Sequence, residues 1–177
     1  MTDRISRLAL FLGLAAVALS LSSCGYRLRG TGTFLPAHIK TVSVPMFRNL
    51  TTRFQLDLKM TQAVIDEIVS RGKVSVVTDN SKSDALLSGE ILTFNVSPIG
   101  FTPGKATADR FNIIVVAKII LRDNVQKRVI FANPAYMYQE EYEVPEGSDF
   151  ESQESDALDK IAEKFARQLV ITILEGF

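Results

Sequence analysis

Cys24 is the only cysteine in the 177-residue chain, and the residues before it indicate one reaction for its thiol. A basic start with Arg4 and Arg7 precedes an apolar run over residues 8–19. That run has the length of a signal-peptide core and is shorter than the roughly 20 residues that span a bilayer. It leads into Leu-Ser-Ser-Cys at 21–24, a bacterial lipobox, in which small residues admit a peptidase and the sulfur accepts a diacylglycerol.

The sequence therefore predicts a signal peptide over residues 1–23 and lipidation at Cys24. The alternatives are an ordinary signal peptide with a cysteine nearby, or a buried thiol. One cysteine cannot form an internal disulfide, and a free thiol would be unusual in a periplasmic protein, so lipidation explains it best. Lipid chains would hold the mature protein on a membrane. Gly25 in place of an aspartate favours sorting to the outer membrane.

Other residues that could do chemistry are few. His38 is the only histidine and lies between Pro36 and a predicted strand, where we expect a solvated imidazole. With Cys24 lipidated, the sequence has no cysteine for nucleophilic catalysis or for a thiolate metal site. It also has no Gly-x-Ser-x-Gly turn and no phosphate-binding glycine loop. We therefore expect no catalytic residue, no metal site and no cofactor.

One carboxylate cluster could supply paired acids for hydrolysis or bind a divalent cation. Part of it falls in a predicted strand-to-helix turn, where acids stabilise a helix N-terminus through its dipole. Its spacing also differs from a calcium-binding loop, so a solvated acidic turn is the preferred interpretation. The cluster comprises Glu140, Glu141, Glu143, Glu146, Asp149, Glu151 and Glu154.

Length and charge fit one domain. The chain has 20 basic and 20 acidic residues. The predicted signal peptide contains two of the basic and one of the acidic residues, so the mature part has 18 basic and 19 acidic residues and a net charge of about −1. Near-neutrality argues against nucleic acid as a partner. Residues 24–37 are rich in glycine and predict a tether, and residues 38–177 are long enough for one domain with a core.

The first half of this domain predicts strand, helix, strand. Ile39–Phe47 alternates, so we expect Val42, Val44 and Met46 to be buried together. Thr52–Gln55 has capping-box spacing and Gly72 supplies a C-terminal stop, which predicts a helix between them. A strand over 74–77 follows at once, so the two strands should be parallel. The expected buried helix face is Phe54, Leu58, Thr61, Ile65 and Ile68.

The second half predicts a meander of strands and a last helix. Long strands are expected over 85–96 and 109–122, then a turn at Asp123-Asn124. A strand over 127–131 should break at Asn133-Pro134 and resume over 136–142. A capping box at Ser148–Glu151 begins the last helix, with the apolar stripe Leu158, Ile161, Ala162, Phe165, Leu169 and Thr172/Ile173. The result is an α+β fold, in the order β-α-β-β-β-α, with two helices packed on one face of a four- to five-stranded mixed sheet.

The strand over 109–122 has a second face that the helices cannot cover. We expect the helices to cover Phe111 and the alternate residues up to Leu121. Opposite them lie Ile114, Val116 and Ile120, which predict a partner interface together with Phe101 in the preceding loop. Burial of this face beneath loops is an equally good alternative.

Cations lie beside that loop. Lys105 and Arg110 both follow the apolar residues 99–101, an arrangement that suits an anionic amphiphile such as a phosphorylated glycolipid. A loop that faces a membrane would look the same.

Three segments resemble one family. Residues 24–30 (CGYRLRG), 35–51 (LPAHIKTVSVPMFRNLT) and 83–91 (SDALLSGEI) are similar in kind and order to the LptE family of lipopolysaccharide-assembly lipoproteins. The resemblance implies an outer-membrane lipoprotein that sits inside the LptD β-barrel, supports its assembly and binds lipopolysaccharide. It implicates a basic residue in the loop between the two long strands, here Lys105 with Arg110 as the neighbouring choice. A second basic position of the family is not matched, because Pro145-Glu146 stands there.

The expected function is thus a plug and assembly partner of an LptD-like barrel in lipopolysaccharide transport. A stand-alone periplasmic lipoprotein that binds a lipid or another ligand is the alternative. An enzyme using the acidic cluster is a weaker third hypothesis.

Overall fold

The computed structural model describes residues 34–100, 108, 110–145 and 150–176. The predicted signal peptide, Cys24 and Lys105 lie outside these residues. In the described part, no helix is both long and apolar enough to cross a membrane.

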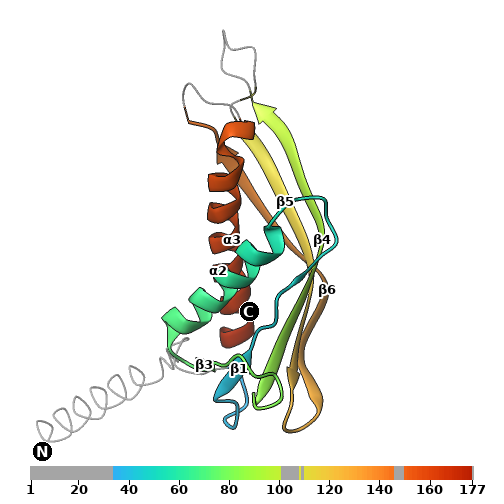
Figure 1. Ribbon diagram of the computed structural model, residues 1–177, viewed down its shortest axis with the longest axis vertical. Coiled ribbons are helices and arrows are strands. Elements are labelled where there is room, and N and C mark those ends of the chain that lie inside the picture. Colours follow the sequence, from blue (N-terminus) through green and yellow to red (C-terminus); the bar gives the residue numbers. More distant parts are fainter. Residues whose placement is uncertain (1–33, 101–107, 109, 146–149, 177) are drawn as a thin grey trace, which may run out of the picture. The chain divides into compact units, whose positions relative to one another are not determined.

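Two helices pack against one face of a single mixed sheet, as predicted (Figure 1). The strands follow one another in space as β3-β1-β4-β5-β6, and a sixth short strand, β2, pairs with β4. The sheet therefore has one more short strand than the four or five expected. The elements are β1 (Thr41–Ser43), β2 (Arg48–Asn49), α2 (Leu56–Arg71), β3 (Ser75–Val76), β4 (Ala85–Gly100), β5 (Arg110–Asp123), β6 (Arg128–Glu143) and α3 (Phe150–Glu175).

The sheet combines a small parallel part with a long antiparallel part. β1 pairs in parallel with both β3 and β4, which confirms the parallel strands on either side of the first helix. β4, β5 and β6 form an antiparallel meander along almost their whole lengths. Short connections join these strands, because consecutive antiparallel strands need no crossover.

The alternation of β5 gives the sheet its two faces, since side chains alternate along a strand. One set faces the helices and is 0–1% exposed, whereas the intervening residues are half-buried. The buried set packs against α3, whose central Phe165 is fully buried. Both the predicted face of β5 and the predicted stripe of the last helix are confirmed. The buried β5 residues are Ile113, Val115, Ala117, Ile119 and Leu121.

The first helix begins later than predicted. Its N-terminal residue is Leu56, preceded by Gln55 in the left-handed region with φ 58°, and no side chain caps it. The predicted capping box is wrong because Asn49 organises the turn: its Oδ1 accepts from the Thr51 amide at 2.9 Å. The hydroxyl of Thr51 in turn accepts from the Arg53 amide at 3.2 Å.

The later start also changes the buried face of α2. Leu56, Met60 and Val64 pack inward with the predicted Thr61 and Ile68. Phe54 is 82% exposed and Leu58 48% exposed, so these two expected core residues face outward. The predicted C-terminal stop is confirmed, because Gly72 has φ 62° and its amide donates to the Val69 carbonyl.

The first strand is shorter than predicted: β1 ends at Ser43, and the chain pairs with β4 again only at β2, after one more residue than β4 has between the two pairings. Val42 is buried as expected, but Met46 is 62% exposed. Phe47 is buried instead, and its backbone amide donates to the Thr61 hydroxyl of α2 at 2.9 Å. Its ring lies so close to Gly89 of β4 that a Cβ there would be 2.7 Å away. A side chain at Gly89 would therefore force the Phe47 ring to move.

The expected break at Asn133-Pro134 is a β-bulge within one continuous strand. Ala117 of β5 pairs with Tyr136, and Ile119 pairs with Asn133, so β6 uses an extra residue between the two pairs. Proline lacks an amide to donate and is tolerated at such irregular positions. The predicted capping residues of the last helix fall partly within 146–149, outside the described part.

Two expectations about the N-terminal part need correction. Phe34 and Leu35, assigned to the tether, pack in the domain: the Phe34 amide donates to the Leu174 carbonyl at 2.8 Å, and Leu35 is buried. His38 is not a freely solvated imidazole, since its Nε2 lies 2.8 Å from Oδ2 of Asp123. Two-thirds of the His38 side chain is shielded from solvent.

Candidate functional site

The face of β4, β5 and β6 that points away from the helices has no described element packed over it, and we call it the open face. A bulge at Leu92 changes which residues of β4 it receives: Glu90 pairs with Lys118, whereas beyond the bulge Thr93 pairs with Val116. The open face comprises Leu86, Ser88, Glu90, Thr93, Asn95, Ser97, Asn112, Ile114, Val116, Lys118, Ile120, Arg122, Met137, Gln139 and Glu141.

Apolar side chains lie along the middle of the open face. Ile114, Val116 and Ile120 are half-buried on β5, and Met137 of β6, paired with Val116, is 60% exposed. The structure thus brings three predicted interface residues together on one strand, whereas Phe101 lies outside the described residues. Sequence reasoning missed Met137, although its place between buried Tyr136 and Tyr138 is a period-two signal.

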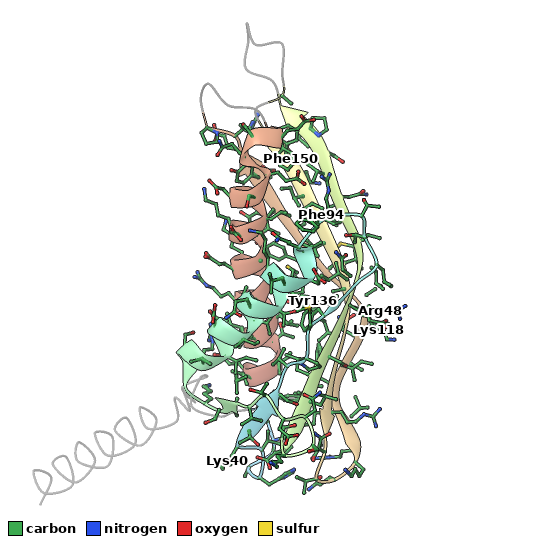
Figure 2. All side chains as sticks on the ribbon, viewed as in Figure 1. Lys40, Arg48, Phe94, Lys118, Tyr136 and Phe150 are labelled. Carbon is green, nitrogen blue, oxygen red and sulfur yellow. The ribbon has the colours of Figure 1, made fainter. Side chains whose placement is uncertain are left out.

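A charged cluster lies at one edge of the open face. Glu90 accepts from Lys118 Nζ at 3.3 Å and lies 3.7 Å from Arg48 Nη1. Figure 2 shows Arg48 and Lys118 next to each other on the side of the sheet away from the helices. Two cations face one carboxylate, so the cluster carries one surplus positive charge beside Ile120 and Met46, with which it lines a shallow pocket of about 250 Å³. Arg48 was not identified from the sequence because only the short β2 pairing brings it to Glu90.

Arg110, the described member of the predicted cation pair, begins β5. It pairs with Gly100 on β4 and with Glu143 on β6. Its guanidinium lies directly over Gly100, where an added Cβ would come within 2.8 Å of Nε. Arg110 makes no ion pair with the described residues, so its charge is not neutralised by them. Lys105 lies outside them, and the distance between the two cations is not described.

Two members of the acidic cluster, Glu140 and Glu154, form ion pairs in the described structure. Glu140 accepts from Lys164 at 2.5 Å and from the Tyr138 hydroxyl at 2.7 Å. These hydrogen bonds, Lys164 first, hold the pKa of Glu140 below its usual range. Glu154 pairs with Arg53 at 2.5 Å. Among the described residues, no three His, Cys, Asp or Glu side chains are grouped closely enough to hold a metal ion.

Enclosed space within the described core is very small. The apolar cavity between sheet and helices, lined by Leu35, Leu87 and Val170 among others, has a volume of about 10 Å³. A lipid chain needs hundreds of cubic ångströms. This cavity is therefore too small to hold a lipid chain.

Known proteins with a similar fold come from several bacteria. The hypothetical protein CT253 from Chlamydia trachomatis is 10% identical with a TM-score of 0.53, covering 76% of this chain and 95% of its own. The PelC dodecamer from Paraburkholderia phytofirmans is 14% identical with a TM-score of 0.53, covering 80% and 92%. At these identities the likeness concerns the fold alone. No curated protein matches the chain.

The sequence itself matches one family. Residues 39–173 match LptE, described as lipopolysaccharide-assembly, from the segment before β1 to the last turns of α3. The match covers both helices, all six strands and the open face, and it agrees with the resemblance of the three segments. The chain therefore belongs to the LptE family of lipopolysaccharide-assembly proteins.

Proposed function

We propose that this protein is an outer-membrane lipoprotein that acts as plug and assembly partner of an LptD-like β-barrel in lipopolysaccharide transport. Membership of the LptE family over residues 39–173 is the observation that carries the proposal. The role requires surfaces and not catalysis, and the open face of the described domain offers such a surface.

The open face is the surface that we assign to the barrel. Its centre is apolar, with Ile114, Val116, Ile120 and Met137, and its periphery is polar. An apolar centre with a polar rim is the usual anatomy of a protein interface. Residues on the helical side are more completely engaged in the protein's own core. We include Phe101 in this interface from the sequence.

The anchor and the lipopolysaccharide site complete the proposal. Lipidation of Cys24, after removal of residues 1–23, would keep the domain at the outer membrane. Arg110, with no ion pair to the described residues, and Lys105 in the adjoining loop would bind phosphate groups of lipopolysaccharide. Arginine and lysine suit that role because a charge-assisted hydrogen bond to phosphate is stronger than a neutral one.

A matched pair of crosslinking sites tests the barrel interface. Met137 on the open face is 60% exposed and Val69 on α2 is 57% exposed, so a photo-crosslinking residue is equally accessible at either position. In intact cells we expect the Met137 position to capture the LptD-like barrel, identified by its own antibody, more strongly than the Val69 position. Capture from neither position would contradict the plug role. Capture from Val69 alone would assign the barrel to the helical side.

A further inference from the structure

β6 is an end strand of the sheet, and no described strand pairs with its outer edge. An unpaired edge presents backbone donors and acceptors to other chains, and proteins usually blunt it with bulges or prolines. Both devices lie in the first half of β6, where the register with β5 shifts near Ile130 and near Pro134. From Tyr136 to Glu143 the register is regular and contains no proline. This second half of β6 is an open template for another strand.

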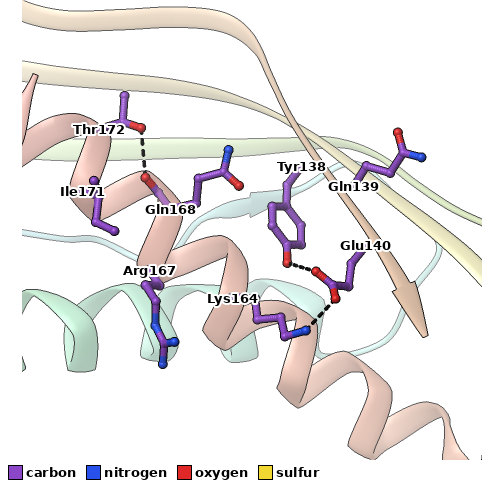
Figure 3. A pocket seen from close by; sticks show the side chains of 8 residues that line it. All are labelled: Tyr138, Gln139, Glu140, Lys164, Arg167, Gln168, Ile171 and Thr172. Carbon is purple, nitrogen blue, oxygen red and sulfur yellow. Dashed lines mark hydrogen bonds and ion pairs between the residues drawn. The ribbon is translucent and has the colours of Figure 1, made fainter. Parts of the chain in front are cut away.

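A groove runs between this half of β6 and α3 (Figure 3). Its volume is about 720 Å³, and Tyr138, Gln139 and Glu140 of β6 line one wall. The other wall comes from α3, with Lys164, Arg167 and neighbouring residues up to Thr172. A strand added beside β6 would direct every second side chain towards this groove, because side chains alternate along a strand.

The charges that line the groove favour acidic side chains of a ligand. Lys164 and Arg167 lie three residues apart on α3 and therefore on neighbouring positions of the helix surface. Lys164 pairs with Glu140, but Arg167 is exposed and makes no ion pair with the described residues. Figure 3 shows Arg167 without an interaction to the other residues that line the groove. The two cations and Glu140 leave one positive charge unpaired here.

The opposite side of the same edge has the opposite charge. Glu141 and Glu143 alternate with the groove-side residues and are exposed on the side of the open face. An incoming strand therefore meets positive charge on one face and negative charge on the other. Cross-strand pairs of opposite charge are favourable, whereas like charges directly opposite one another are destabilising.

We propose that an extended segment of a partner protein adds to β6 along Tyr136–Glu143, with its acidic side chains in the groove and basic or neutral ones on the other face. Main-chain hydrogen bonds would provide affinity, and the carboxylate that reaches Arg167 would select the segment. The chain's own tether is a poor occupant, since Arg27 and Arg29 bring positive charge to a positive groove. The proposal does not depend on the barrel partnership.

The test uses the full lipidated chain in detergent micelles and defined, fluorescently labelled octapeptides. In one peptide glutamate alternates with threonine, and in its match lysine replaces glutamate. By fluorescence anisotropy we expect the glutamate peptide to bind at least tenfold more tightly. Arg167→Glu should remove that preference, while Arg122→Glu, the same change at an exposed site on β5, should preserve it. Circular dichroism verifies that both variants are folded.

N-methylation separates strand pairing from charge attraction. Every second amide of a strand points to the same edge. Methylating the set of amides that faces β6 should abolish binding of the glutamate peptide, and methylating the set that faces away should leave binding intact. Equal binding of both methylated peptides, or of the glutamate and lysine peptides, would overturn the proposal. So would a dimer in sedimentation experiments that Arg167→Glu dissociates, because a second copy would then occupy the edge.

Discussion

The His38 ring nitrogen Nε2 lies 2.8 Å from Oδ2 of Asp123, a carboxylate with a fully buried side chain. This contact joins the segment before β1 to the end of β5 across 85 positions of sequence. The other oxygen of Asp123 accepts from the amides of Val125 and Gln126, at 2.9 and 2.8 Å, and so closes the turn into β6. One carboxylate therefore organises both the entry to the domain and the β5–β6 turn.

Acid should weaken the fold partly through this carboxylate. Burial favours the protonated form, but hydrogen bonds from Gln126, His38 and Val125 outweigh it and hold the pKa of Asp123 below its usual value. A lowered pKa stabilises the fold above the unfolded value of about 3.9, and that contribution is lost as pH falls through the folded pKa.

Asp123→Asn isolates this contribution, because an asparagine oxygen can still accept the two turn amides. We expect the variant to be less stable at pH 7, and to lose less stability than wild type between pH 7 and pH 3, in urea titrations. If Asp123→Asn loses as much stability between pH 7 and pH 3 as wild type does, the effect of acid does not come from Asp123.

Phe165 should be a principal core residue. Its side chain is fully buried. The rings of Tyr136 and Tyr138 contact its ring edge-on, with ring centroids 5.6 and 6.2 Å away. Phe165→Ala should lower the free energy of unfolding by about 3–5 kcal/mol, because it leaves a cavity between α3 and β6. Phe54→Ala removes the same side chain from an 82% exposed site and should change the free energy of unfolding by less than about 0.5 kcal/mol. Equal losses in the two variants would place the core elsewhere.

A side chain at Gly89 should destabilise the fold while Phe47 is present. Because an added Cβ would lie 2.7 Å from the ring, Gly89→Ala should destabilise the fold by about 1–3 kcal/mol. Shortening the ring in the double variant Gly89→Ala/Phe47→Leu should recover part of that loss relative to the two single changes. Additive losses in this double-mutant cycle would show that the two positions are not in contact.

The sequence predicts those parts of this fold that depend on short-range periodicity. The two faces of β5 follow from a strict alternation of Ile113 to Leu121, and the end of α2 follows from one glycine. The start of α2 was missed because a side chain seven positions upstream, Asn49, sets the turn that precedes it. No local pattern links His38 to Asp123 or Arg48 to Glu90, since the chain topology alone brings those pairs together. The half-buried apolar residues on β5 were predictable for the same reason as its core, whereas Met137 was missed although it alternates with Tyr136 and Tyr138.

Cys24→Ala should impair function by removing the protein from the outer membrane and not by unfolding it. If the thiol carries the lipid, this variant should be missing from the outer-membrane fraction and should fail to support assembly of the barrel, while its purified domain melts at the wild-type temperature. Membrane fractionation and immunoblotting of the barrel measure both effects. A soluble, periplasmic Cys24→Ala protein that fully supports barrel assembly would contradict the importance of the anchor.

Val115 and Val116 are adjacent on β5, and substitutions of the two distinguish a folding role from an interface role. Val115 is fully buried against the helices, whereas Val116 is half-buried on the open face. Val115→Asp should cost more than about 3 kcal/mol, because it buries a charge without a partner. Val116→Asp should cost about 1 kcal/mol, the scale of strand propensity, since its carboxylate can reach water and lies near Lys118. If the open face contacts the barrel, Val116→Asp should nevertheless reduce co-purification of the LptD-like protein, because the charge must lose its water on association. Retained co-purification of a folded Val116→Asp protein would remove the open face from the interface.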